Sequence, residues 1–201
     1  MNSILLLGST SASRQQLLHE ARIPFLCVPQ SADESLCDWA LPLPQLVASI
    51  ARYKMEHVLV PSGKQGLRCF VVTADTLGHD IQGVISGKPT SREDAYAKIK
   101  IAREGIFTGT AFCLDKKVYD NGAWHLEKRI EKYVSGECTF NVPDAWIERY
   151  LDNSPALQAS GAIAIDGYGA QFLESVRGSY TGIVGLPLYE LREALSEIGF
   201  F

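Results

Sequence analysis

The sequence lacks the features of two large classes of protein. It has no block of basic residues, and its formal net charge is -4, so a nucleic-acid polymer is not an expected partner. The apolar run at residues 4–7 is too short for a signal peptide or a membrane span, and no basic residue precedes it. We therefore expect neither a nucleic-acid polymer nor a membrane as a partner.

Cysteine, histidine and glycine also lack the spacings of familiar sites. The five cysteines are scattered, with no C-x-x-C pair, and the four histidines form no metal motif. This pattern predicts a reduced protein located in the cytoplasm. The glycines of a Walker loop and of a dinucleotide fingerprint are missing as well, which excludes those two kinds of nucleotide site.

The composition and pattern that are present predict one α/β domain. The 201 residues are 46% hydrophobic, which fits a single domain over residues 1–201 with a sizeable core and room for two lobes. Strand-like runs alternate with helix-like segments in the first half, and Asp120-Asn121-Gly122 then signals a hairpin. The predicted fold class is α/β, with a mixed sheet flanked by helices.

Residues 69–76 (CFVVTADT) form an apolar run of strand length that ends in a carboxylate and a hydroxyl. Lys88 follows after a turn-rich segment, and His79 is expected in that loop. An unpaired acid adds no stability to a buried strand, whereas strand ends often carry functional acids. Two interpretations stay open: either Asp75 does chemistry and Lys88 binds a negatively charged group, or Asp75 caps a turn and Lys88 is solvated.

Residues 9–14 (STSASR) lie between a predicted strand at residues 3–7 and a predicted helix at residues 14–21. Hydroxyls and backbone N–H groups at a helix start can hold an anion, and Arg14 adds a fork suited to phosphate oxygens. The alternative is ordinary capping by one serine. Four hydroxyl residues in five exceed what a cap requires, so the segment favours an anion site.

Lys54 lies on the apolar stripe of a helix predicted at about residues 45–59, so it either snorkels at the edge or points into a cleft. The polar exceptions of the chain are Ser9, Ser11, Arg14, Glu34, Lys54, Asp75, Lys88 and Asp166. Such a set suits metal-assisted attack on a polyphosphate, in which carboxylates hold the ion and cations neutralise the phosphates. Oxygen ligands favour magnesium or manganese, although sequence spacing does not show that these residues meet.

Taken together, the motifs resemble the Maf family of nucleoside triphosphate pyrophosphatases over nearly the whole chain. They are LGSTSASR at 7–14, DE at 33–34, ARYK at 51–54, ADT at 74–76, GKP at 87–89, TG at 108–109, GYG at 167–169, GSY at 178–180 and VGLP at 184–187. Each piece is short, but their order and spacing together are specific.

The resemblance implies a hydrolase of acid anhydrides that converts a nucleoside triphosphate to its monophosphate and pyrophosphate with a divalent metal, Mg or Mn. It implies an elongated fold of two lobes with a central cleft, similar to the inosine triphosphate pyrophosphatases, and a homodimer. By the same resemblance, Asp75 is the proton acceptor and a metal ligand with Glu34, while Arg14, Lys54 and Lys88 line the phosphate and metal site.

The resemblance also assigns substrate choice to Ser13, Thr76 and Asp166. Thr76 keeps the family residue, Ser13 replaces an arginine or an aromatic residue, and Asp166 replaces the usual glutamine. An ionised aspartate only accepts hydrogen bonds, so it would favour a donor edge or a cationic base, or it would join the metal ligands.

The sequence leaves several hypotheses about the function open. The hydroxyl run and the lack of an arginine at position 13 favour the branch that acts on 7-methyl-GTP, and the alternative is a pyrimidine (dTTP, UTP or CTP) pyrophosphatase. A non-catalytic nucleotide-binding regulator of cell division is a further alternative, which the retained Asp75, Lys54 and Lys88 make less favoured. A phosphate-sugar binding protein would explain the hydroxyl run but not the acids.

Overall fold

A computed structural model describes residues 4–201. Its strands are β1 (Leu5–Leu7), β2 (Phe25–Cys27), β3 (Arg68–His79), β4 (Ile85–Ser86), β5 (Ile106–Asp120), β6 (Ala123–Phe140) and β7 (Leu173–Gly178). Its α-helices are α1 (Ala12–Glu20), α2 (Leu43–Glu56), α3 (Arg92–Ile101), α4 (Ile147–Asn153), α5 (Tyr180–Val184) and α6 (Leu188–Glu197). Among the described residues, no helix combines the length and apolar character needed to cross a bilayer.

The strands form one seven-stranded sheet in the order β2-β1-β3-β5-β6-β7, with β4 paired to β3. Strand β1 pairs in parallel with β2 and β3, whereas β3 with β4 and β6 with β7 are antiparallel. The predicted α/β class with a mixed sheet flanked by helices is therefore confirmed.

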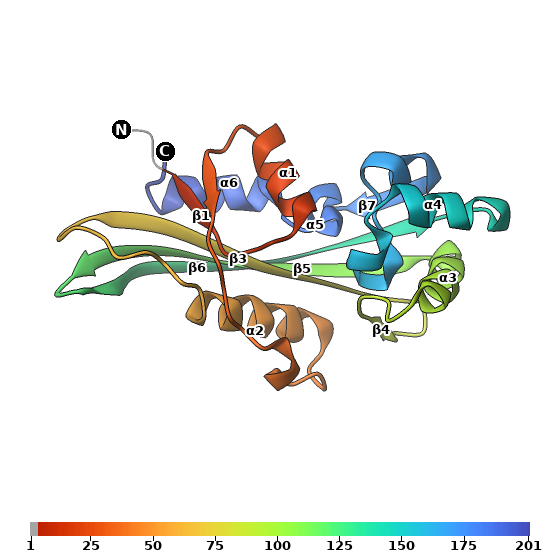
Figure 1. Cartoon of the computed structure of the whole chain (residues 1–201), viewed down its shortest axis with the longest axis horizontal. Coiled ribbons are helices and arrows are strands. Elements are labelled where there is room, and N and C mark those ends of the chain that lie inside the picture. The colour runs from red at the N-terminus through yellow and green to blue at the C-terminus, as the bar shows by residue number, and fades with distance from the viewer. Residues whose placement is uncertain (1–3) are drawn as a thin grey trace. The chain divides into compact units, whose positions relative to one another are not determined.

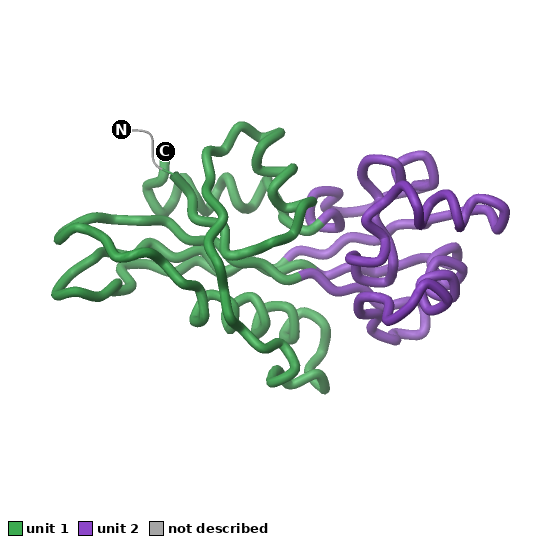
Figure 2. The backbone as a smooth tube through the Cα atoms, in the orientation of Figure 1, with its two compact units in different colours: residues 1–75, 110–133, 185–201 green, residues 76–109, 134–184 purple. Residues whose placement is uncertain are grey.

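The chain divides into two compact units (Figure 2). Unit 1 contains residues 1–75, 110–133 and 185–201, and unit 2 contains residues 76–109 and 134–184. The boundaries fall inside strands β3, β5 and β6. The single domain over residues 1–201, its elongation and its central cleft stay predictions.

In unit 1, helix α2 covers one face of the sheet and helices α1 and α6 cover the other (Figure 1). The stripe predicted for α2 is present: Leu46, Val47, Ile50 and Ala51 are buried, and Lys54 is buried with them. A proline in the first turn suits the start of this helix, because its missing N–H would have no helical partner there. Periodic apolar residues thus place α2 and fix which of its side chains face the sheet.

In unit 2, one core joins α3, α4 and β6, through residues that include Ala95, Ile99, Phe140, Ile147 and Tyr150. Helix α3 begins with a capped turn, since the Asp94 N–H donates to the hydroxyl of the N-cap Ser91 at 3.1 Å.

Several predicted boundaries differ from the structure by a few residues. Helix α1 begins at Ala12 rather than at residue 14, and α2 covers Leu43–Glu56 rather than about 45–59. The predicted first strand included Ser3, which lies outside the described residues. The predicted hairpin is confirmed: Asn121 and Gly122 have φ of 49° and 81° between β5 and β6, as a tight hairpin turn requires.

Strand β3 does not end at Asp75, which corrects the predicted strand end. The strand continues to His79 because β4 supplies backbone partners, with Gly78 opposite Ser86 and His79 opposite Ile85. His79 is therefore a strand residue and not a loop residue, and its ring stacks on Phe107 at 5.2 Å. Asp75 lies inside a long strand, so the capping interpretation of this acid is wrong.

Candidate functional site

The hydroxyl run at the start of α1 surrounds a buried arginine. Ser11 is the N-cap, and its hydroxyl accepts from the Arg14 N–H at 3.5 Å. The Ser9 hydroxyl accepts from the Ser11 N–H and from Arg14 Nη1, both at 3.2 Å. Arg14 Nε donates to the Gly185 carbonyl at 2.8 Å, while Ser13 is the half-buried second residue of the helix. The run thus caps the helix through one serine and orders a guanidinium through another.

The Arg14 guanidinium lies within electrostatic reach of two carboxylates. Burial lowers the pKa of this guanidinium from its ordinary value, and the charges of Asp75 and Glu34 act in the opposite direction. An arginine stays protonated in a protein, so this position carries a buried positive charge. A guanidinium has the planar fork geometry that matches phosphate oxygens, so Arg14 is suited to hold them.

Lys54 joins the two carboxylates directly. Its Nζ lies 2.7 Å from Asp75 Oδ1 and 2.9 Å from Glu34 Oε1. Only 8% of the Lys54 side chain is exposed, so it does not snorkel to solvent, whereas its orientation toward a cleft stays a prediction. Helix α2 presents it to β3 because it lies on the buried stripe, one turn after Ile50.

The second oxygen of Asp75 differs from the first. Asp75 Oδ2 is buried and has no hydrogen-bond partner among residues 4–201. A buried carboxylate oxygen without a partner is costly, so this atom is suited to receive a proton, a water molecule or a cation.

The donor set also fits a magnesium or manganese ion. Glu34, whose side chain is 42% exposed, is held by the same lysine as Asp75, so two carboxylates meet here. Residues 4–201 contain no cluster of three or more His, Cys, Asp or Glu side chains arranged to hold a metal. Magnesium is commonly bound by one or two carboxylates, with substrate phosphates and water completing the shell.

The remaining predicted residues belong to unit 2. Thr76 follows Asp75 on β3 and is half-buried, Lys88 is exposed, and Asp166 is half-buried. The Gly161 N–H donates to the Gly87 carbonyl at 3.0 Å, so the segment before Lys88 lies beside the segment that leads to Asp166. Unit 1 thus brings Ser9, Arg14, Glu34, Lys54 and Asp75 together, and unit 2 brings together the segments that carry Lys88 and Asp166.

Comparison with known proteins identifies the family. The family described as Maf-like protein matches residues 4–198. The chain belongs to the Maf-like family. It is 32% identical to a dTTP/UTP pyrophosphatase of Caldicellulosiruptor saccharolyticus, over 98% of this chain and 95% of that protein. It is 30% identical to a nucleoside triphosphate pyrophosphatase of Synechococcus sp., over 98% of this chain and 94% of that protein. It is 32% identical to a dTTP/UTP pyrophosphatase of Acholeplasma laidlawii, over 96% of this chain and 96% of that protein. The predicted family is therefore confirmed.

Two supporting residues of this Maf-like protein could not be recognised from its sequence. The buried Tyr150 hydroxyl donates to the Ala162 carbonyl at 2.9 Å and accepts from the Ala164 N–H at 2.8 Å. Gly169 leaves room for the same segment, since a Cβ there would lie 1.8 Å from the Ala164 carbonyl oxygen. Both shape the backbone before Asp166, yet a tyrosine and a glycine in these positions have no distinctive spacing.

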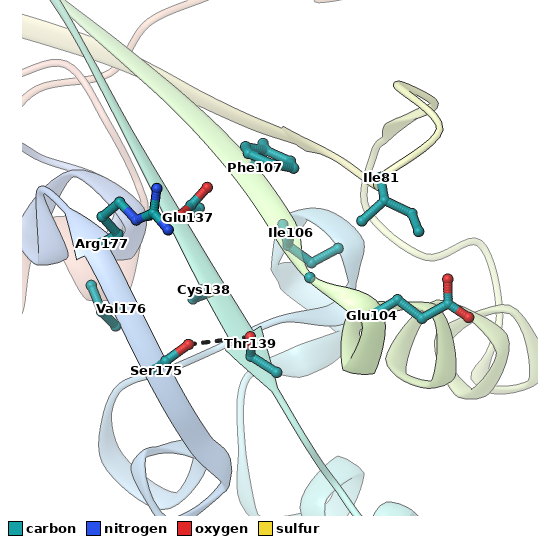
Figure 3. A pocket seen from close by; sticks show the side chains of 11 residues that line it. Ile81, Glu104, Ile106, Phe107, Glu137, Cys138, Thr139, Ser175, Val176 and Arg177 are labelled. Carbon is teal, nitrogen blue, oxygen red and sulfur yellow. Dashed lines mark hydrogen bonds and ion pairs between the residues drawn. The ribbon is translucent and has the colours of Figure 1, made fainter.

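The Maf-like protein also has a pocket of about 380 Å³ within unit 2 (Figure 3). Its lining includes the ion pair of Arg177 with Glu137, at 2.7 Å, and the hydrogen bond from Ser175 to Thr139, at 3.2 Å. None of the predicted site residues lines this pocket, so it is separate from the candidate site.

Proposed function

We propose that this Maf-like protein hydrolyses a nucleoside triphosphate to the monophosphate and pyrophosphate. The observation that carries the proposal is the arrangement around Asp75, with one oxygen held by the buried Lys54 and the other without a hydrogen-bond partner among the described residues. Its relatives are named nucleoside triphosphate pyrophosphatase and dTTP/UTP pyrophosphatase, which supports the same reaction.

Asp75 takes the role of general base in this proposal. Its Oδ2 accepts a proton from a water molecule, and that water attacks the α-phosphorus of the triphosphate. The bond from that phosphorus to the bridging oxygen breaks, and pyrophosphate leaves. Lys54 holds Oδ1 at 2.7 Å, which fixes the direction in which Oδ2 points.

Positive groups balance the charge of the phosphates. Arg14 offers a buried guanidinium at the start of α1, and Lys54 and Lys88 add ammonium groups. Asp75 and Glu34 would hold a Mg or Mn ion, which would supply further charge neutralisation at the phosphate oxygens.

Two substrate classes follow from separate observations. The names of the relatives favour the pyrimidine nucleotides dTTP and UTP. Asp166 favours 7-methyl-GTP instead, because a carboxylate accepts well from two adjacent donors and attracts a cationic base. Ser13 and Thr76 are the other two residues proposed to contact the base.

The proposed setting is the cytoplasm, where the five free cysteine side chains would stay reduced. We also propose a homodimer as the assembled form, with neither a nucleic-acid polymer nor a membrane as a partner.

A nucleotide panel tests the proposed reaction. The purified chain is incubated with dTTP, UTP, CTP, GTP and 7-methyl-GTP, each with Mg or Mn, and pyrophosphate release is measured. We expect release from dTTP and UTP or from 7-methyl-GTP. Binding without release from any triphosphate with either metal would contradict the proposal and favour the non-catalytic regulator.

A further inference from the structure

We propose that Thr73 is a positioning residue whose hydroxyl holds the Lys54 turn of α2 against the strand that carries Asp75. The effect on turnover rests on the proposed function, whereas the effect on geometry does not. Thr73 is fully buried in β3, within unit 1.

The hydrogen bond that carries this inference crosses from the sheet to the helix. Thr73 Oγ1 donates to the Ala51 carbonyl at 2.6 Å, and Ala51 lies inside α2. Thr73 comes two residues before Asp75, so both side chains point to the same face of β3. Ala51 comes three residues before Lys54, so the two share one face of the helix. The bond therefore lies next to the Lys54–Asp75 ion pair and joins the same two elements.

The methyl group of Thr73 contacts a third segment. A Cβ placed on Gly8 would lie 2.8 Å from Thr73 Cγ2, so this methyl already packs against Gly8. The Gly8 N–H donates to the Val72 carbonyl at 2.9 Å, which holds the start of the hydroxyl run to β3. One threonine thus touches the segments that carry Ser9, Lys54 and Asp75.

Fold stability alone does not require the hydroxyl. A valine has the shape of threonine and a high β-propensity, so it would fill the same space in a buried strand. The Ala51 carbonyl would not be left unpaired, because a carbonyl inside an α-helix accepts from the N–H four residues later. If Thr73 were only a packing residue, Thr73→Val would therefore keep full turnover.

The test separates the two halves of the side chain. Thr73→Val keeps the methyl and removes the donor, and Thr73→Ser keeps the donor and removes the methyl. We expect Thr73→Val to lower kcat about tenfold to hundredfold with KM within about twofold, because small displacements of reacting groups cost rate. Thr73→Ser should restore kcat to within about threefold of the original chain.

Ser49→Ala is the matched control. The Ser49 hydroxyl also donates to a carbonyl, that of Leu46 at 2.8 Å, but both residues lie within α2. Its loss removes the same kind of bond from the same helix without releasing α2 from β3. We expect unchanged kcat for this variant.

A crystal structure of Thr73→Val gives a readout that does not depend on activity. We expect the distance from Lys54 Nζ to Asp75 Oδ1 to exceed hydrogen-bond length, compared with 2.7 Å in the original chain. If Thr73→Val does not fold, Thr73→Ala replaces it in both measurements. If the original chain releases no pyrophosphate, the proposed function fails and this distance alone decides the inference.

Three results would overturn the inference. One is an unchanged Lys54–Asp75 distance in the variant without the hydroxyl. Another is unchanged kcat in that variant while the original chain is active. The third is a Thr73→Ser chain as slow as Thr73→Val, which would show that the hydroxyl is not what matters.

Discussion

Tyr150 shows how a single buried polar atom can support a distant segment. Its side chain is fully buried in α4, and its hydroxyl bridges the Ala162 carbonyl and the Ala164 N–H. Ala162 has a φ of 58°, a conformation that non-glycine residues rarely adopt. The tyrosine thus helps to hold a strained turn shortly before Asp166.

Tyr150→Phe is expected to destabilise the fold by about 1–3 kcal/mol, because it leaves a buried carbonyl and a buried N–H without their partner. The free energy of unfolding in urea at pH 8 measures this loss. Tyr119→Phe is the control, since Tyr119 is only partly buried in β5. Equal stability of the Tyr150 variant and the original chain would show that the bridge contributes nothing.

The same tyrosine predicts a dependence of stability on alkaline pH. Burial raises the pKa of Tyr150 to about 12, from an ordinary value of 10.0. Above pH 10 the unfolded chain releases the phenol proton while the folded chain keeps it, so rising pH favours unfolding. The stability advantage over Tyr150→Phe should therefore shrink from pH 10 toward pH 12. Urea unfolding of both chains across this range checks it, and a constant difference would contradict it.

At the scale of elements, the parts set by local chemistry were predictable. The apolar spacing predicted α2, and Asn121-Gly122 predicted the hairpin, because helical periodicity and turn propensity act over a few residues. The predicted end of β3 was wrong because the strand continues by pairing with β4, and the local sequence pattern does not contain that pairing.

The candidate site was predictable only in part, for the same reason. The residue types of Asp75, Lys54 and Glu34 suggested chemistry, but their meeting around one ammonium joins positions far apart in sequence. Thr73 gave no signal, because threonine is an ordinary residue of a strand and its bond to Ala51 exists only once α2 packs on β3.

The hairpin of β5 and β6 contains an ion pair in which the acid is buried and the arginine is half-buried. Asp115 is fully buried, and its carboxylate accepts from Arg129 Nε and Nη2 at 2.7 and 2.9 Å. Both residues belong to unit 1, and the hydrogen bonds that Arg129 donates to Asp115 raise the pKa of the guanidinium. A bidentate ion pair between Arg129 and the buried Asp115 carboxylate thus joins the two strands.

Arg129→Ala is expected to cost about 3–5 kcal/mol of the free energy of unfolding, because it removes the main partner of a buried charge. Arg68→Ala is the control: Arg68 pairs with Glu127 at 2.9 Å, but 56% of its side chain is exposed. We expect less than about 1 kcal/mol there. Urea unfolding measures the free energy of unfolding of both variants. Equal losses in the two would show that burial of the acid does not determine the cost of removing its arginine.

At the scale of the whole molecule, the predicted roles divide between the two units. Ser9, Arg14, Glu34, Lys54 and Asp75 belong to unit 1. Unit 2 contains Thr76, Lys88 and Asp166. Under the proposed function, bond cleavage and base choice would therefore depend largely on residues of different units, and we expect them to respond separately to substitution.

Asp166→Gln is expected to change the ranking of bases and to leave the cleavage step nearly intact. Replacing a charged acceptor with a neutral amide should shift the kcat/KM ratio of UTP to 7-methyl-GTP toward UTP by about tenfold or more. Asp152→Asn is the control, since Asp152 lies on α4 and is an exposed partner of Arg92. The ratios are measured by pyrophosphate release. An unchanged ratio in Asp166→Gln would show that this position does not select the base.

The most direct test of the account is pyrophosphate release by Asp75→Asn beside the original chain, with the best nucleotide of the panel. The amide keeps the shape of the carboxylate but cannot serve as a general base, so we expect kcat to fall by about 10²–10⁴. Circular dichroism and the thermal midpoint would show that the variant is folded. A folded Asp75→Asn chain with full activity would contradict the role given to Asp75.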